Sequence, residues 1–343
     1  MKKQFIDLRS DTVTEPTSAM KKAMFEAPLG DDVFGEDPTI NLLEKKAAEM
    51  FAMESALFVP SGTMSNQIAI KVHTQPGEDI ICDNLSHIYQ YEGGGIGLNA
   101  GCSTSLITTP SGQFSAHNVE QLIYPDDIHK PISRLVSVEN TCNKGGGSTW
   151  DIKPLKEIKT VCDQHDLKFH LDGARLFNAL IANDQSPKQY GELFDTISIC
   201  LSKGLGAPVG SILLGSIADI HRAKRYRKVF GGGMRQAGIL AAAGIYALDH
   251  HIERLHEDHK NAKEIENTLL DLPWIKSVTP VETNIVIFEP QKEFNDSQIT
   301  QALKEKGILI SSMGPRKLRI VTHLDISDSE YYFLKKTLTT LYV

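Results

Sequence analysis

The chain has 343 residues, of which 41% are hydrophobic, and a formal net charge of −7 at pH 7. This length exceeds what one compact core usually holds, so we expect two domains. The negative charge and the lack of basic runs argue against nucleic acid or an anionic membrane as the main partner.

Targeting and cysteine patterns narrow the setting further. No apolar stretch reaches transmembrane length, and Met1–Gln4 lead into polar sequence without the apolar core of a signal peptide. We therefore expect a cytoplasmic protein with no membrane partner. The cysteines are odd in number and widely spaced, with no C-x-x-C pair, so the sequence predicts reduced thiols and no metal site. They are Cys82, Cys102, Cys142, Cys162 and Cys200.

The chain begins with an N-terminal arm, residues 1–40, which is rich in charges and in Gly/Pro punctuation. An amphipathic helix is predicted from Pro38 to Phe51. The short strand 57–59 then leads into Ser61, Gly62 and Thr63 at the start of another helical pattern. Free backbone N–H groups at such a helix start, with the Thr63 hydroxyl, can bind a phosphate, although an ordinary helix cap is the alternative.

Strands and helices alternate after this point, which indicates an α/β fold with a mainly parallel sheet covered on both faces. We expect strands at 79–83 and 134–139, a helix at 154–165, and strands that end near Asp172 and Lys203. Ligands of such sheets bind at the carboxyl ends of the strands, which is where Asp172 and Lys203 both fall.

Lys203 follows the β-branched, apolar run 196–201 and precedes a glycine-rich turn. A lysine that is desolvated and fixed in this way can condense with an aldehyde, whereas a surface lysine on a loop is the alternative. Asp172, at the end of a short strand, suits the carboxylate that pyridoxal phosphate needs against its ring nitrogen. The order phosphate loop, aspartate, lysine therefore favours a pyridoxal enzyme.

The sequence changes character after Gly231. An alanine-rich segment at 237–247 is followed by a charged helical run at 248–270, and we place the domain boundary near this helix. The prediction is a large domain at 41–245 and a smaller C-terminal α/β domain at 246–343. The latter is expected to have strands at 284–288, 308–311 and 317–322, with helices at 297–306 and 327–341.

Two other patterns carry little weight. Residues 93–97 contain G-x-G but lack the full spacing of a dinucleotide-binding loop, and no clear strand leads into them. His256 and His259 lie in the sequence HEDH, one residue too close for a zinc-binding H-E-x-x-H helix, so a solvated charged face explains them better.

Eight motifs spread over nearly the whole chain resemble those of the L-type (low-specificity) threonine aldolases, which are pyridoxal-phosphate enzymes of the aspartate aminotransferase fold. The resemblance implies a large domain that binds pyridoxal 5'-phosphate on a mixed, mainly parallel sheet. It also implies that the arm packs over the active site and against a neighbouring subunit. The motifs are DLRSDTVT (7–14), GDDVFGEDPT (30–39), FVPSGTMSN (58–66), HIYQYEGGG (87–95), HLDGARLFNA (170–179), LSKGLGAPVGS (201–211), GGGMRQAGILAAAG (231–244) and RIVTHLDIS (319–327).

The resemblance further implies roles for single residues. Lys203 would bind the cofactor covalently, Asp172 would face its ring nitrogen, and His87 would stack on the ring and serve in proton transfer. Lys228 and Arg235 would reach the cofactor phosphate from a partner subunit, in a homodimer or homotetramer with shared sites, with surface charge as the alternative. The other implied contacts are Ser61, Gly62, Thr63 and Arg175 at the cofactor, and Ser10, Arg175, Arg319, Tyr91 and Cys142 at the amino acid substrate.

The implied reaction is cleavage of L-threonine or L-allo-threonine, or of other β-hydroxy-α-amino acids, to glycine and an aldehyde. A lyase for bulkier substrates such as phenylserine, a β-eliminating lyase, and a non-catalytic protein that kept the fold are the alternatives. Cys142 is a departure, because the family usually has Glu-Asn-Thr-His-Asn where this chain has Glu-Asn-Thr-Cys-Asn at 139–143. The missing histidine usually faces the substrate hydroxyl, so we expect looser discrimination of threonine from allo-threonine and a roomier pocket.

Overall fold

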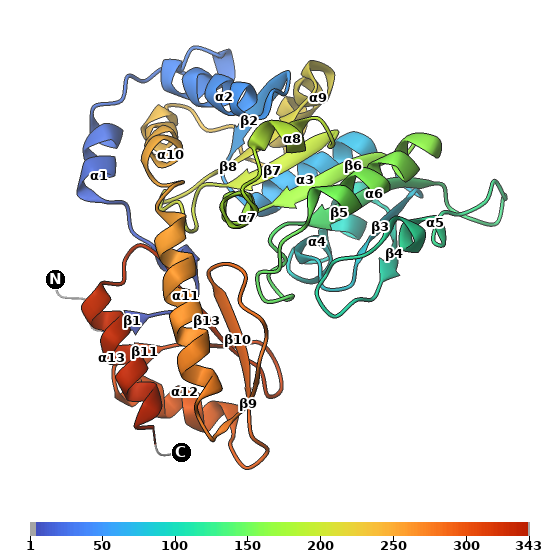
Figure 1. Cartoon of the computed structure of the whole chain (residues 1–343). Helices are drawn as coiled ribbons and strands as arrows, with labels where there is room; N and C mark the ends of the chain where they lie inside the picture. The colour runs from blue at the N-terminus through green and yellow to red at the C-terminus, as the bar shows by residue number, and fades with distance from the viewer. Residues whose placement is uncertain (1–4, 342–343) are drawn as a thin grey trace.

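The computed structural model describes residues 5–341, and Met1–Gln4 lie outside this range. Two sheets dominate the described chain, a larger one of seven strands and a smaller one of four (Figure 1). The strand order in the larger sheet is β2-β8-β7-β6-β5-β3-β4. Its strands are β2 (Ser55–Val59), β3 (Asp79–Asp83), β4 (Ser103–Ile107), β5 (Ser133–Glu139), β6 (Lys168–Gly173), β7 (Thr196–Cys200) and β8 (Ser211–Gly215).

The larger sheet confirms the predicted mainly parallel α/β architecture. The pairs β3–β4, β3–β5, β5–β6 and β6–β7 are parallel, and β8 runs antiparallel to both of its neighbours, β2 and β7. Asp172 pairs in register with Glu139 on one side and with Ser198 on the other. The carboxyl ends of β5, β6 and β7 therefore bring polar residues to one edge of the sheet.

Side chains of the larger sheet are buried on both faces, which explains why its strands read as continuous apolar runs. Leu57 and Val59 of β2 pack with α3 (Gly62–His73) and α9 (Ile217–Val229). Ala56 and Phe58, which alternate with them, pack on the opposite face with α2 (Pro38–Phe51), and α6 (Ile152–Gln164) packs against β6. Strands β4 and β8 lie outside the strands expected from sequence.

The remaining helices join these layers. Helix α1 (Ser18–Phe25), in the arm, packs on α10 (Gly238–His250). One prediction is wrong here, because the run 248–270 is not a single helix: α10 ends at His250, and α11 (Leu255–Leu270) begins after a turn. In that turn the buried His251 bonds through Nδ1 to the Leu205 carbonyl at 2.7 Å, which ties the turn to the loop after β7. The short helices are α4 (His87–Gln90), α5 (Ala116–Glu120), α7 (Leu176–Asn183) and α8 (Pro187–Gly191).

The smaller sheet is antiparallel and has the order β12-β13-β10-β9. The expected strand 308–311 is split by the buried Ile310: its first part pairs with the arm strand β1 (Ile6–Asp7), and the second joins the smaller sheet. The elements are β9 (Ile275–Val278), β10 (Ile285–Pro290), β11 (Ile308–Leu309), β12 (Ser311–Ser312), β13 (Leu318–Val321), α12 (Asp296–Glu305) and α13 (Asp328–Thr339).

The arm reaches both parts of the molecule, because β1 pairs with β11 beside the smaller sheet while α1 packs on α10 (Figure 1). The division into an arm, a large domain and a small domain at 40/41 and 245/246 stays a prediction. Among the helices of the described residues, none is both long and apolar enough to cross a membrane.

Candidate active site

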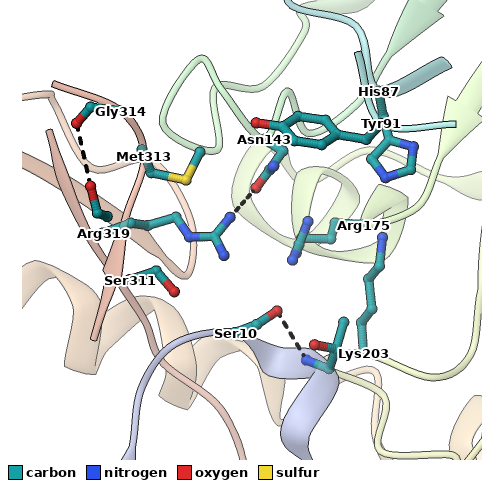
Figure 2. Close-up of a pocket in the computed structure, with 12 residues that line it drawn as sticks. Ser10, His87, Tyr91, Asn143, Arg175, Lys203, Ser311, Met313, Gly314 and Arg319 are labelled. Carbon is teal, nitrogen blue, oxygen red and sulfur yellow. Dashed lines mark hydrogen bonds between the residues drawn. The ribbon is translucent and has the colours of Figure 1, made fainter. Parts of the chain in front are cut away.

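A cavity of about 540 Å³ lies at the carboxyl edge of the larger sheet, where the arm and the smaller sheet meet it. Figure 2 shows side chains from all three parts pointing toward one another around it. The lining residues are Ser10, Thr12, His87, Tyr91, Asn143, Arg175, Lys203, Ser311, Ser312, Met313, Gly314 and Arg319. Six of the residues predicted for the site are thus brought together by the fold: Ser10, His87, Tyr91, Arg175, Lys203 and Arg319.

Lys203 is held by the turn that follows β7. Its carbonyl accepts hydrogen bonds from the Gly206 amide at 2.8 Å and from the Thr14 hydroxyl of the arm at 3.0 Å. Gly206 has a φ of +75°, a conformation that favours glycine. The side chain extends toward His87 and Arg175 (Figure 2), and its Nζ has no hydrogen-bonding partner among residues 5–341. A fixed backbone with a free amine suits a covalent attachment point.

Asp172 is almost fully buried, at 2% exposure, near the end of β6. Its Oδ1 accepts from the Ala174 amide at 3.2 Å, and its Oδ2 accepts from the Asn66 side chain at 3.0 Å. Burying a carboxylate is costly unless donors or a cation face it. Asp172 therefore fits a partner with a protonated nitrogen.

His87 begins α4 and lies between two acidic residues. Its Nδ1 is 3.0 Å from Glu92 Oε1, and its backbone amide donates to Glu139 Oε2 at 2.9 Å. Burial lowers the pKa of His87, but the Glu92 hydrogen bond and the nearby negative charges outweigh burial and raise the pKa above 6.5. Nδ1 is occupied, so Nε2 is the nitrogen left to exchange a proton.

Glu139, at the end of β5, is fully enclosed behind His87. Burial, reinforced by the charge of Asp172, raises the pKa of Glu139 to about 7. Its carboxylate accepts from the His87 and Asn143 amides, which ties α4 to the loop after β5. The side chain thus fixes two segments of the cavity wall.

Arg175 follows β6 and forms a buried, bidentate ion pair with Asp11 of the arm. Its Nε and one terminal nitrogen donate to the two Asp11 oxygens at 2.8 and 2.6 Å. Burial would raise the pKa of Asp11, but the charge and hydrogen bonds of Arg175 hold it well below 3.8. Asp11 uses one edge of the guanidinium, so the other terminal nitrogen is left to face the cavity.

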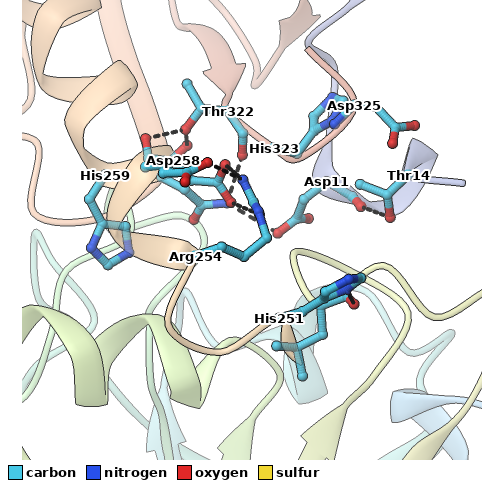
Figure 3. A network of polar contacts seen from close by, with 12 residues as sticks. Asp11, Thr14, His251, Arg254, Asp258, His259, Thr322, His323 and Asp325 are labelled. Carbon is cyan, nitrogen blue, oxygen red and sulfur yellow. Dashed lines mark hydrogen bonds and ion pairs between the residues drawn. The ribbon is translucent and has the colours of Figure 1, made fainter. Parts of the chain in front are cut away.

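Asp11 is in turn supported by a polar network between the arm, α11 and the loop after β13 (Figure 3). Asn284 donates to Asp11 and to the Thr322 carbonyl, both at 3.2 Å, and the Thr322 hydroxyl donates to the Asp258 carbonyl. Arg254 pairs with both oxygens of Asp258 at 2.7 and 2.9 Å. Arg175 is therefore anchored to the arm directly and, through Asp11 and Asn284, to the loop after β13.

Arg319, on β13, approaches the cavity from the smaller sheet. One terminal nitrogen donates to Asn143 Oδ1 at 2.6 Å and the other to the Arg9 carbonyl at 2.9 Å. Its Nε is buried with no partner within the described chain. Burial, together with the charge of Arg175, lowers the pKa of Arg319 to about 10. Two neighbouring cations that line one cavity form an anion site of the kind that a carboxylate fills.

The predicted phosphate residues lie outside the lining of this cavity. Ser61 caps α3 by accepting from the Met64 amide, and the α3 start remains accessible to solvent. A Cβ at Gly62 would lie 2.6 Å from Cys200 Sγ, so this position needs glycine. Lys228 is exposed, and Arg235 pairs with Asp31 of its own arm at 2.9 Å.

Cys142 is fully buried at 1% exposure and is also outside the lining, whereas the next residue, Asn143, is part of it. A Cβ added to Gly112 would lie 2.2 Å from Cys142 Sγ, so the thiol packs tightly against that loop. Burial raises the pKa of the Cys142 thiol well above its usual value. Its contact with the substrate hydroxyl stays a prediction.

Several residues of the site were not predicted. They are Asp11, Asn66, Glu92, Glu139 and Asn143. Each lies within or beside a motif that was recognised, such as DLRSDTVT or HIYQYEGGG, so the motifs marked the segments without assigning the contacts.

The donor set fits pyridoxal phosphate on chemical grounds. It offers a free lysine amine, a buried carboxylate, an imidazole and an open helix start within one region of the fold. The lysine amine matches the aldehyde of the cofactor, and the carboxylate matches its ring nitrogen. The imidazole matches the ring face, and the helix start matches the phosphate.

Known proteins resemble the chain over nearly all of its length. The sequence profile of the beta-eliminating lyase family matches residues 7–293. The low-specificity L-threonine aldolase of Escherichia coli K12 is 42% identical over 95% of this chain and 96% of its own. Low-specificity L-threonine aldolase 1 of Arabidopsis thaliana is 39% identical over 96% of this chain and 94% of its own. A solved threonine aldolase structure from Leishmania major superposes with a TM-score of 0.86 at 20% identity, covering 98% of this chain and 99% of that one.

Proposed function

The chain belongs to the family of the low-specificity L-threonine aldolases, and from this premise we propose that it cleaves L-threonine and L-allo-threonine to glycine and acetaldehyde, with pyridoxal 5'-phosphate as cofactor. The observation that carries the proposal is the convergence of Lys203, His87 and two arginines on one cavity, with the buried Asp172 beside it. The proposed activity is that of a carbon–carbon lyase.

The cofactor would be held by residues from three elements. Lys203 Nζ would hold the aldehyde, Asp172 would face the ring nitrogen, and the α3 start at Ser61, Gly62 and Thr63 would receive the phosphate. When bound, pyridoxal phosphate supplies an electron sink for the charge left on the substrate α-carbon. The free Lys203 amine and the buried Asp172 carboxylate support this assignment.

The α-carboxylate of the substrate would lie between Arg175 and Arg319, with Ser10 beside them. The unused nitrogen of Arg175 is the donor available to it, and Arg319 adds a second positive charge to the cavity wall. This clamp orients the rest of the substrate toward Lys203 and His87. Tyr91, whose ring lies 5.6 Å from that of His87, would border the side-chain space.

The β-hydroxyl proton would pass to Nε2 of His87, because Glu92 occupies Nδ1. The raised pKa of His87, in which the Glu92 hydrogen bond overcomes burial, makes the imidazole a stronger base at this step. Lys203 Nζ, which extends into the same cavity, would return a proton to the α-carbon of the product once it is released from the aldehyde.

A shared active site is the proposed assembly, as a homodimer or homotetramer. Large apolar side chains of the arm and of the end of α9 are exposed: Phe25 at 88%, Phe34 at 73% and Val229 at 77%. Val33 also lies beside Gly233 and Lys228, so the arm and this basic segment form one surface. A second copy of the chain would cover the apolar groups and bring its Lys228 and Arg235 toward the phosphate.

A cytoplasmic location and a place in glycine metabolism belong to the same proposal. The cysteines Cys82, Cys102, Cys142, Cys162 and Cys200 are all free and buried, as suits a reducing compartment. The substrate is a small amino acid, and neither nucleic acid nor a membrane is proposed as a partner.

The test is product analysis of the holoenzyme. We expect glycine and acetaldehyde from L-threonine and L-allo-threonine and no release from the D-isomers. A β-eliminating lyase, which the family match also allows, would instead form ammonia and a keto acid from serine. Benzaldehyde from phenylserine without acetaldehyde from threonine would support the bulky-substrate alternative and contradict the proposal.

A further inference from the structure

The side-chain amide of Asn66 lies between two buried carboxylates at the base of the candidate site. Asn66, on α3, is 1% exposed. Its Nδ2 donates to Glu92 Oε1 at 2.8 Å and to Asp172 Oδ2 at 3.0 Å. One ring nitrogen of His87 and one oxygen from each of these two carboxylates all lie within 4.8 Å of one another.

This arrangement requires an amide. Ionised carboxylates only accept hydrogen bonds, and one amide nitrogen carries two hydrogens, so Asn66 satisfies both acids without adding a charge. A hydroxyl has a single hydrogen and could serve just one of them. Both donors of Asn66 are therefore committed, and its carbonyl oxygen must face the other way.

That oxygen meets a second buried residue, His170, whose Nε2 is 3.2 Å from Asn66 Oδ1. Burial lowers the pKa of His170 to about 4, so the ring is neutral near pH 7. Since Oδ1 is an acceptor, Nε2 carries the hydrogen, and Nδ1 accepts from the Thr196 hydroxyl at 2.9 Å. The Thr196 hydroxyl oxygen is also 3.0 Å from His73 Nε2 and accepts from it. Each group in the series His73, Thr196, His170, Asn66 therefore donates to the next, and Asn66 donates to Asp172.

The same amide reaches His87 through Glu92. Glu92 Oε1 accepts from Asn66 and also lies 3.0 Å from His87 Nδ1, while Glu92 Oε2 accepts from Gln67 Nε2. Asn66 is thus connected to Asp172 directly and to His87 through one carboxylate. Gln67, the next residue in the chain, contacts only the Glu92 side of this pair.

We propose that Asn66 is a positioning residue that holds Asp172 and, through Glu92, His87 in one fixed arrangement, with His170 fixing the orientation of its amide. This rests on the proposed function, in which Asp172 and His87 serve the bound cofactor. Hydrogen bonds to buried charged groups are strong, and leaving such groups unpaired is costly. Loss of the amide would loosen both residues at once.

The test compares Asn66→Ala and Asn66→Asp with the matched control Gln67→Ala. Titration of each apoprotein with pyridoxal phosphate gives the dissociation constant, and steady-state kinetics at saturating cofactor give kcat and KM. We expect both Asn66 variants to weaken cofactor binding roughly tenfold to hundredfold. At saturation kcat falls while KM for threonine stays within about threefold, because Arg175 and Arg319 are untouched. Gln67→Ala keeps cofactor affinity within about threefold of wild type.

Asn66→Asp has the shape of asparagine without its donors, so wild-type affinity in this variant would overturn the proposal. An equal loss of cofactor affinity in Gln67→Ala and Asn66→Ala would overturn it as well. If Asn66→Asp does not fold, the comparison of Gln67→Ala with Asn66→Ala decides the question by itself. A wild-type protein that binds the cofactor but releases no acetaldehyde would instead refute the proposed function and leave the inference about Asn66 standing.

Discussion

Replacing Asp11 with asparagine probes the anchor of the substrate-binding arginine. Asp11 is completely buried and forms a bidentate pair with Arg175, whose side chain is 6% exposed. Asp11→Asn keeps the shape but removes the charge, and its amide hydrogens would oppose donors from Arg175 or Asn284. Removing one partner of a buried pair typically costs about 3–5 kcal/mol, because the other charge is left uncompensated.

The chain offers a matched control in Asp7→Asn. Asp7 and Arg9 form a bidentate pair with the same 2.6 Å contact, in the same arm, but the Arg9 side chain is 52% exposed. An exposed pair contributes about 1 kcal/mol or less, so Asp7→Asn should change the free energy of unfolding little. The contrast isolates burial, since the geometry is alike.

Urea unfolding of the apoprotein near pH 7 measures the difference. Burial alone would raise the pKa of Asp11, but Arg175 lowers it in the folded state. The contribution of Asp11 to the free energy of unfolding is therefore present above pH 3.8 and is lost as the pH falls toward the folded-state pKa. In the holoenzyme, KM for L-threonine should rise roughly tenfold because the Arg175 fork is no longer fixed. Equal losses of stability in Asp11→Asn and Asp7→Asn would show that burial does not determine the strength of these ion pairs.

Three further predictions concern other parts of the site. Burial and the charge of Asp172 raise the pKa of Glu139 to about 7 in the folded protein. The free energy of unfolding should therefore fall between pH 4.5 and pH 7, by up to about 1.4 kcal/mol per pH unit. Urea unfolding at several pH values measures this slope, and Glu139→Gln should flatten it. Cys142→His should raise the rate on threonine more than on phenylserine, whereas equal effects would show that position 142 only packs against its neighbours. Mixed dimers of Lys203→Ala and Arg235→Ala subunits should regain some activity if the site is shared, and no recovery in verified mixed dimers would indicate one-chain sites.

The strand ends that carry Asp172 and Lys203 were predictable because their signals are local. An apolar, β-branched run followed by glycines marks a strand and its turn within a few residues. The helix start at Ser61 was recognised from the same kind of short-range pattern. The family motifs then connected these segments to a common site.

Contacts between distant residues were beyond such patterns. Asn66 and Asp172 are 106 positions apart, and Arg175 and Asp11 are 164 apart, so nothing in either segment alone indicates the pair. The break between α10 and α11 was missed for the same reason, because His251 bonds to a carbonyl 46 positions away. Helical periodicity continues through the break, and a tertiary contact overrides it.

Lys203 is the residue proposed to bind the cofactor aldehyde. Borohydride reduction of the protein loaded with pyridoxal phosphate, followed by peptide mass mapping, tests this directly. We expect the reduced cofactor on the peptide that contains Lys203, and we expect Lys203→Ala to carry no label and to have no aldolase activity. A label on another lysine, or retained labelling in Lys203→Ala, would contradict it.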